Sequence, residues 1–315
     1  MKDKGNKVGL FIGTERGYLA LLKLLKAKVN VICVLILKQD KHEIRNFAAK
    51  IEELCIKHNI PFNFSTKITP SLYRDYLLKY KPDAVFLVGW RFLIPTECLK
   101  IPTRGIFVLH DSLLPKYRGI SPTTWPLING EKETGLSLIY ADVLMDAGDI
   151  VDQIKITIEE NDSGFTMNNK YLKLIPEIIL KNLDLILSGS NKRIRQDSSK
   201  ATYGCKRVPE DGKISFDKAS REIVRLIRAL TYPYPGAFCY YKKKKIIIWE
   251  ASMVRNPRVY VGRISGRIIS VSKAGPVEVL CGDGILRVEK ISLPDKPDDF
   301  LVPNTILNSI SQSLT

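Results

Sequence analysis

The chain has 315 residues, of which 45% are hydrophobic and 26% charged, and its formal net charge is +16. Because single cores stop growing near roughly 250–300 residues, this length predicts two domains. No apolar run approaches the roughly 18–20 residues of a membrane span, and the polar N-terminus does not resemble a secretory signal, so we expect a cytoplasmic protein with no membrane partner. The lysines are dispersed, and charge alone therefore does not predict nucleic-acid binding.

The cysteines are scattered along the chain: Cys33, Cys55, Cys98, Cys205, Cys239 and Cys281. None belongs to a Cys-x-x-Cys pair, so the spacing indicates neither a zinc site nor a disulfide framework. We expect reduced, mostly buried thiols and no bound metal.

Apolar runs and amphipathic segments alternate through the N-terminal part of the chain. We expect strands over 8–14, 29–36, 61–63, 84–88 and 106–109, with helices over 19–25, 44–58 and 70–79 between the first four. Buried apolar strands that alternate with helices are typical of an α/β domain with a Rossmann-like, open parallel sheet.

Ligands of such sheets bind beyond the carboxyl ends of the strands. We expect the active site at this edge, because three of the expected strands end there with Gly13 and Thr14, residues 89–91, and His110. No Gly-x-Gly-x-x-Gly loop follows the first strand, since only Gly13 and Gly17 occur at its end. A dinucleotide cofactor is therefore disfavoured.

A second domain is expected after a helix over 167–187. Polar stretches at 188–191 and 196–200 predict a linker, which divides the chain into residues 1–202 and 203–315. Beyond it we expect a helix over 220–230 and short strands over 237–241, 246–250, 263–271, 277–281 and 285–293. Several short strands at this spacing indicate a small β-barrel of the OB type.

Two polar segments of that barrel carry separate expectations. The lysine run at 242–245 lies between two strand-like segments and predicts a solvated hairpin tip. The tail that ends at Thr315 is polar, and we expect it to fray.

His110 lies at the end of an expected strand, and an acidic loop with Asp142, Asp146 and Asp149 follows later in the chain. An acid near an imidazole fixes its tautomer and makes it a competent proton carrier, which suits acyl-type transfer to an amine. The plainer alternative is a histidine that makes a structural hydrogen bond and an ordinary turn aspartate.

Residues 115–119 form a turn with two cations, Lys116 and Arg118. Such a turn suits the phosphate or carboxylate of a substrate, which arginine binds bidentately and lysine as a point charge. On composition alone, a solvated loop is the favoured interpretation, because pairs of exposed basic residues are common in a chain this basic.

The segments 110–119 (HDSLLPKYRG), 129–135 (NGEKETG) and 146–150 (DAGDI) together resemble the signature of the folate-dependent formyltransferases. That family includes methionyl-tRNA formyltransferase, glycinamide ribonucleotide transformylase and the sugar-nucleotide N-formyltransferases. Segments 207–212, 233–238 and 281–284 are similar to the family's C-terminal barrel, so the resemblance covers nearly the whole chain.

The resemblance implies transfer of the formyl group of N10-formyltetrahydrofolate to a primary amine, with His110 and Asp146 as the catalytic pair. It implies donor binding by Gly89, Trp90, Arg91, Phe92, Leu93, Ile94, Ala141 and Asp142. It leaves Gly13, Thr14, Lys116, Tyr117 and Arg118 as candidates to bind the acceptor.

The preferred acceptor is the amine of a nucleotide-linked amino deoxysugar. The tRNA enzymes of the family carry a long basic insertion after the second strand, whereas residues 38–43 here pass quickly into a helix. Residues 89–94 and 147–148 also look closer to the sugar-nucleotide enzymes. Methionyl-tRNA is the disfavoured alternative, and a homodimer stays open.

One position departs from the family pattern, because Val108 stands where well-studied members have an asparagine. Loss of one oxyanion donor typically lowers the rate by about 10²–10³, or roughly 2.7–4 kcal/mol. Three interpretations follow: an active enzyme with rearranged donors, a slow enzyme, or a non-catalytic protein that binds folate or a nucleotide. The first is favoured because His110, Asp146 and the basic turn are all retained.

Overall fold

The computed structural model describes residues 6–38, 46–65, 69–120 and 122–315, and the chain forms two compact units. The first unit comprises residues 1–122, 133–157 and 168–205, and the second comprises 123–132, 158–167 and 206–315. Two short segments that precede residue 202, 123–132 and 158–167, therefore belong with the C-terminal residues, whereas the predicted boundary places them in the first domain.

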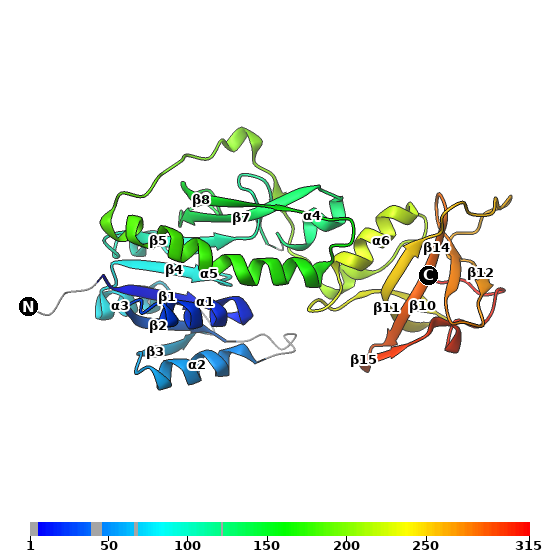
Figure 1. Cartoon of the computed structure of the whole chain (residues 1–315), viewed down its shortest axis with the longest axis horizontal. Helices are drawn as coiled ribbons and strands as arrows, with labels where there is room; N and C mark the ends of the chain where they lie inside the picture. Colours follow the sequence, from blue (N-terminus) through cyan, green and yellow to red (C-terminus); the bar gives the residue numbers. More distant parts are fainter. Residues whose placement is uncertain (1–5, 39–45, 66–68, 121) are drawn as a thin grey trace, which may run out of the picture. The chain divides into compact units, whose positions relative to one another are not determined.

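The first unit contains a seven-stranded sheet in the order β3-β2-β1-β4-β5-β7-β8 (Figure 1). Its parallel strands are β1 (Val8–Ile12), β2 (Val31–Leu37), β3 (Phe62–Ser65), β4 (Ala84–Val88) and β5 (Gly105–His110). The antiparallel strands β7 (Glu133–Tyr140) and β8 (Ile150–Thr157) extend it beyond β5. The predicted Rossmann-like sheet is thus confirmed, with a β7–β8 hairpin that the sequence pattern did not indicate.

Helices pack on this sheet through their apolar faces. They are α1 (Thr14–Lys26), α2 (Phe47–Lys57), α3 (Pro70–Tyr80) and α5 (Gly164–Ser188), with a short 3-10 turn at Thr96–Cys98. Helix α3 begins with a proline after Thr69, whose hydroxyl accepts from the Leu72 N–H, a favourable start. Its Tyr73 and Leu77 pack against Phe11 of β1, while α1 contacts α2 and lies with α5 in front of the sheet in Figure 1. Over the described residues, no helix has the length and apolarity needed to cross a bilayer.

The carboxyl ends of β1 and β4 meet closely. Gly89 has a φ of +65°, and a Cβ there would lie 2.7 Å from the Gly13 carbonyl oxygen and 2.8 Å from Thr14 Oγ1. Only glycine fits this approach. The expected ligand edge of the sheet therefore contains residues from both strand ends.

The second unit is built on an antiparallel sheet in the order β10-β11-β14-β13-β12, with β15 paired to β14. Its elements are α4 (Thr124–Asn129), α6 (Ser220–Ala229), β10 (Ala237–Tyr241), β11 (Lys244–Met253), β12 (Ile268–Val271), β13 (Val277–Leu280), β14 (Ile285–Leu293) and β15 (Lys296–Leu301). Helix α6 packs against β11 and β14, and its Ile223 and Ile227 enter a core with Ile248 and Val288.

The last residues of the chain join the two ends of this sheet. Tyr240 of β10 and Thr315 exchange backbone hydrogen bonds at 2.7 and 3.0 Å, and the Leu314 N–H donates to Gly266 at 2.8 Å. Ile268 of β12 donates to the Gln312 carbonyl at 3.1 Å. The expectation that the tail frays is wrong, because Leu314 is only 2% exposed and the segment completes the pairing between β10 and β12.

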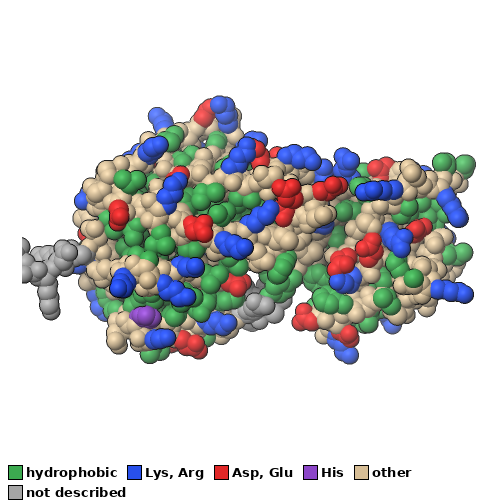
Figure 2. Space-filling model, in the orientation of Figure 1, with side chains coloured by type: hydrophobic (Ala, Val, Ile, Leu, Met, Phe, Trp, Pro, Cys, Tyr) green, Lys and Arg blue, Asp and Glu red, His purple; other side chains and the backbone are tan. Residues whose placement is uncertain are grey.

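Lysines occupy surface turns. Lys242 and Lys243 join β10 to β11 with φ values of 48° and 64°, and Tyr241 pairs with Lys244 across them. This positive φ at both central residues is typical of a tight type I′ hairpin, so the predicted tip is confirmed. On the face shown in Figure 2, Lys and Arg side chains are spread among acidic ones.

Candidate active site

His110 ends β5 and is buried, with 6% of its surface exposed. Its Nε2 lies 2.8 Å from the Tyr117 carbonyl oxygen, and its Nδ1 lies 3.5 Å from Oδ2 of Asp146. A carbonyl oxygen can only accept, so Nε2 carries a hydrogen in this arrangement. Nδ1 faces the Asp146 carboxylate, which can accept a hydrogen bond from it, so the arrangement suits passage of a proton at this nitrogen.

Asp146 lies on the loop between β7 and β8, and its side chain is 14% exposed. The oxygen that faces His110 also accepts the Gly119 N–H at 2.7 Å. The Asp146 backbone has a φ of 53°, a left-handed conformation that side chains other than glycine adopt mainly when neighbours enforce it. The carboxylate is therefore held in one place by both its side chain and its backbone.

The turn after His110 is tied down internally. The Ser112 hydroxyl donates to the Lys116 carbonyl at 2.6 Å, and the Ser137 hydroxyl of β7 donates to the Ser112 carbonyl at 2.6 Å. Ser137 Oγ also accepts the Leu114 N–H at 3.2 Å and an amide hydrogen of Gln153 at 2.8 Å. These bonds fix the path of the chain that carries Tyr117 back to the imidazole.

Val108 precedes His110 by two residues on β5, so both side chains lie on the same face of the sheet. Val108 is half-buried and packs against Leu114, Ile139 and Ile150. The position for which the resemblance implies an amide donor is therefore an apolar contact in this chain.

The loop after β4 exposes some of its expected donor-binding residues and buries others. Arg91, Phe92 and Leu93 are exposed, the two apolar side chains by 41% and 58%. Trp90 instead donates its indole N–H to the Tyr73 hydroxyl at 2.9 Å, and Ile94 is 4% exposed within the core. The side chains of Trp90 and Ile94 thus belong to the core.

The loop after β7 presents a second apolar surface. Val143, Leu144 and Met145 are exposed by 50%, 67% and 43%. Asp142 shapes this tip by accepting the Leu144 N–H at 3.0 Å, while Ala141 donates to the Ile106 carbonyl at 2.7 Å. Exposed apolar side chains on a loop that also carries Asp146 suit contact with a flat ring.

The expected acceptor residues have different surroundings. Arg118 is 3% exposed, and its Nε and Nη2 donate to Gln196 Oε1 at 3.1 and 2.8 Å. The Arg118 guanidinium is therefore buried against a side chain in this structure. Lys116 is exposed, Thr14 is partly exposed and Gly13 is buried. Tyr117 is half-buried, and its carbonyl oxygen accepts from His110.

A buried ion pair lies directly after His110 in the sequence. Arg16 of α1 binds Asp111 with an Nη1–Oδ2 distance of 2.5 Å, and Asp111 is 4% exposed. The Tyr171 hydroxyl donates to the Asp111 carbonyl at 2.9 Å, and Arg16 also donates to Asn168. Sequence reasoning missed this cluster, since nothing in the local pattern links Arg16 of the first helix to residues near His110.

Most of the cysteine thiols are buried, which does not favour a reactive thiolate. All six cysteines are free, and only Cys205 is exposed. Burial raises the pKa of Cys33 and Cys55 to about 12, so these thiols stay protonated. Within the described ranges, no group of three His, Cys, Asp or Glu side chains is arranged to hold a metal.

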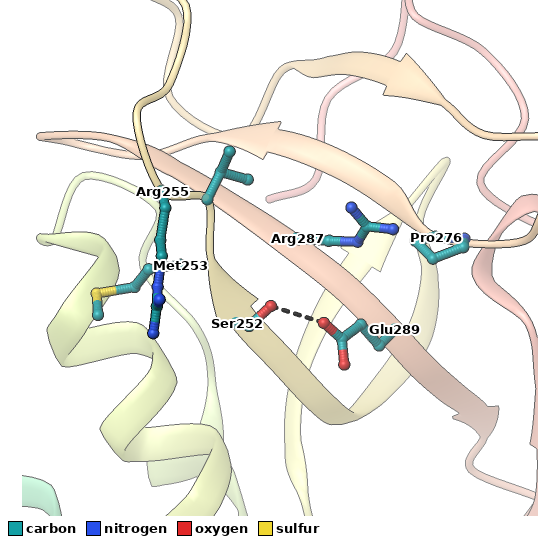
Figure 3. Close-up of a pocket in the computed structure, with 7 residues that line it drawn as sticks. Ser252, Met253, Arg255, Pro276, Arg287 and Glu289 are labelled. Carbon is teal, nitrogen blue, oxygen red and sulfur yellow. Dashed lines mark hydrogen bonds between the residues drawn. The ribbon is translucent and has the colours of Figure 1, made fainter. Parts of the chain in front are cut away.

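A hollow of about 710 Å³ opens on the second unit (Figure 3). Its walls come from the end of β11, the start of β13 and the middle of β14, and the Ser252 hydroxyl donates to Glu289 at 2.6 Å. Its lining residues are Ser252, Met253, Val254, Arg255, Pro276, Arg287 and Glu289. None of them belongs to the predicted site.

Comparison with known protein families shows the family to which this chain belongs. Residues 15–183 match the formyl transferase family, and residues 206–298 match the formyl transferase C-terminal domain. The chain belongs to the formyl transferase family. The resemblance drawn from residues 110–119 is thereby confirmed.

One curated relative is similar over most of this chain. The chain is 39% identical over 247 residues to the bifunctional polymyxin resistance protein ArnA of Wigglesworthia glossinidia brevipalpis. That alignment covers 78% of this chain but 38% of the relative, so the chain spans well under half of that protein's length.

Two solved formyltransferases share the fold across most of their length. One is an N-formyltransferase from Helicobacter canadensis, solved with folinic acid and dTDP-3-aminofucose, with a TM-score of 0.69 and 22% identity over 90% of this chain and 98% of that one. The other is WlaRD, a sugar 3N-formyl transferase solved with dTDP and 5-N-formyl-THF, with a TM-score of 0.64 and 22% identity over 91% and 97%.

Proposed function

We propose that this protein transfers a formyl group from N10-formyltetrahydrofolate to the primary amine of a nucleotide-linked amino sugar. One observation supports the proposal: the buried ring of His110 lies between the Tyr117 carbonyl and the Asp146 carboxylate, and the motif resemblance implies that these two residues are the catalytic pair. The alternative of a merely structural histidine does not account for a carboxylate at 3.5 Å held in a left-handed backbone conformation.

The chemistry requires one proton to move. The bond between the formyl carbon and the donor nitrogen is replaced by a bond to the acceptor amine, and a proton passes from that amine to the departing nitrogen. When bound, the folate supplies the activated formyl carbon. In this proposal His110 accepts and returns the proton at Nδ1, and the facing Asp146 carboxylate orients the ring.

The donor fits the two exposed apolar loops. Phe92 and Leu93 on one loop, and residues 143–145 on the other, present apolar surface that a flat pterin ring would cover. Backbone groups of residues 89–94 then remain to meet the polar edge of the ring. Asp146 follows residues 143–145 directly, so donor binding would fall beside the proton-transfer pair.

The acceptor class follows from relatives and from charge. Two similar structures are sugar N-formyltransferases solved with dTDP or a dTDP-linked amino sugar, and ArnA is a polymyxin resistance protein. Lys116 is exposed on the turn that carries Tyr117, where a cation suits the phosphates of a nucleotide-linked sugar.

The test is release of tetrahydrofolate from N10-formyltetrahydrofolate, followed by absorbance, with nucleotide-linked 3-amino and 4-amino deoxysugars and with initiator methionyl-tRNA. Turnover with one sugar supports the proposal. Turnover with charged tRNA alone would show that the acceptor is methionyl-tRNA and not a nucleotide-linked amino sugar. Silence across the panel, with folate still bound, favours the non-catalytic alternative that Val108 raises.

A further inference from the structure

Gln196 lies in a stretch whose polarity predicts a linker, yet it is only 7% exposed. Its Nε2 donates to the carbonyl oxygens of Asp146 and Gly148, both at 2.8 Å. Its Oε1 accepts from Arg118 at 3.1 and 2.8 Å. One amide therefore connects the loop that carries Asp146 to the turn that carries the other partner of His110.

The surrounding segment is anchored on both sides of Gln196. We call residues 191–204 the return segment. Before Gln196, Ile194 exchanges backbone hydrogen bonds with Ile150 at 2.8 and 2.9 Å. After it, the Thr202 carbonyl accepts the Arg118 N–H at 2.8 Å, and the Thr202 hydroxyl accepts the Tyr117 N–H at 2.9 Å. These anchors fix where the Gln196 amide stands.

The Asp146 loop depends on such support. Residues 142–145 at its tip are exposed, and Asp146 itself has a left-handed backbone that packing must enforce. Gln196 donates both of these hydrogen bonds to backbone carbonyl oxygens of the loop, those of Asp146 and Gly148. The amide therefore fixes the main chain of the loop and not only the side-chain rotamer of Asp146. Without it, the two carbonyls and the Arg118 guanidinium lose a buried partner.

We infer that Gln196, oriented by Arg118, is a positioning residue for formyl transfer that holds Asp146 against His110. The kinetic part of this inference rests on the proposed function. The structural part does not, since it concerns only where the Asp146 loop stands.

Gln196→Glu tests the donor function of the amide separately from its acceptor function. A glutamate keeps an acceptor for Arg118 but cannot donate to Asp146 and Gly148, and it has nearly the same shape. We expect kcat to fall about 10–100-fold with KM for the folate donor changed less than about threefold, because small misplacements of reacting groups have effects of this size. Wild-type kcat in Gln196→Glu would overturn the inference.

The matched control is Asn182→Ala, compared with Gln196→Ala. Asn182 is 6% exposed, and its Nδ2 donates to Asp152 Oδ2 at 2.8 Å and to the Ile178 carbonyl at 2.9 Å. It thus loses the same number of buried donor bonds without touching the Asp146 loop. We expect a lower Tm in both alanine variants and a lower kcat only in Gln196→Ala. An equal loss of kcat in both would reduce Gln196 to a general stabilising residue.

Hydrogen exchange tests the positioning without any activity. The Gly119 N–H donates to Asp146 Oδ2 at 2.7 Å, so its protection reports whether the carboxylate is in place. In exchange measured by mass spectrometry, we expect peptides that contain Gly119 to exchange at least about tenfold faster in Gln196→Glu than in wild type or Asn182→Ala. Unchanged exchange overturns the inference. If the wild type transfers no formyl group, the proposed function fails and this measurement still decides the positioning.

Discussion

His110 and Asp146 face each other, but the two residues are held by different means. His110 ends a strand that hydrogen-bonds to β4 on one side and β7 on the other, and it is buried. Asp146 stands on a loop with an exposed tip, and it is hydrogen-bonded to Gly119 and Gln196, which are distant in the sequence. The imidazole therefore belongs to the sheet, and the carboxylate belongs to a loop held by other parts of the chain.

The site thus has a strand half, which carries His110, and a loop half, which carries Asp146, and we expect the two to respond differently to substitution. A residue in a central strand is released only when the sheet unfolds, whereas a loop with few buried contacts opens at a lower free energy. A loop that carries both an apolar surface and the acid can also adjust when a ligand covers that surface. Substitutions in the two halves should accordingly separate chemistry, loop position and global stability.

The largest effect is expected from His110→Ala. Removal of the proton carrier should lower kcat by about 10⁴, at the upper end for one acid-base residue, because no second imidazole faces Asp146 among the described residues. Folate binding, measured by fluorescence titration, should be retained. His58→Ala, at the exposed end of α2, is the matched control and should behave as wild type. A kcat within tenfold of wild type would exclude His110 as the proton carrier.

Asp146→Asn addresses the loop half directly. Asparagine can still accept the Gly119 N–H, and the Gln196 bond to the backbone is untouched, so the loop should keep its position. Only the negative charge that faces His110 is lost, and we expect kcat to fall by about 10³ with little change in Tm. Asp184→Asn on the exposed side of α5 controls for the change in net charge. Equal kcat in the two variants would show that the facing carboxylate plays no part.

Arg16→Met tests the support behind the strand half. It leaves the buried Asp111 carboxylate without this guanidinium, and we expect the free energy of unfolding in urea to fall by about 3 kcal/mol. The folded variant should keep its kcat within about tenfold, because the strand and turn still carry His110. Arg74→Met removes an exposed pair with Asp75 and should change stability by less than about 1 kcal/mol. Equal losses in both variants would show that burial of the Arg16 pair does not matter.

The same division explains what the sequence could predict. Strand β4 over 84–88 and strand β10 over 237–241 have the predicted bounds, because an apolar run is a local signal. The return segment and the tail could not be recognised in the same way. Gln196 and Thr315 are polar residues in polar stretches, and what makes them structural is a set of partners far away in the chain. The burial of Arg118 could not be predicted for the same reason, since the sequence does not show which cations are buried.

The smallest effect concerns Val108, which lies two residues before His110 on the same face of β5. Val108→Asn would place an amide donor there, and we expect kcat to rise about tenfold, less than the full value of an oxyanion donor because the neighbours Leu114, Ile139 and Ile150 do not orient it. Lost packing should lower Tm by a few degrees. Val108→Ala loses packing without gaining a donor, so it separates the two effects. If kcat rises in neither variant, the oxyanion is stabilised by a group other than the side chain at position 108.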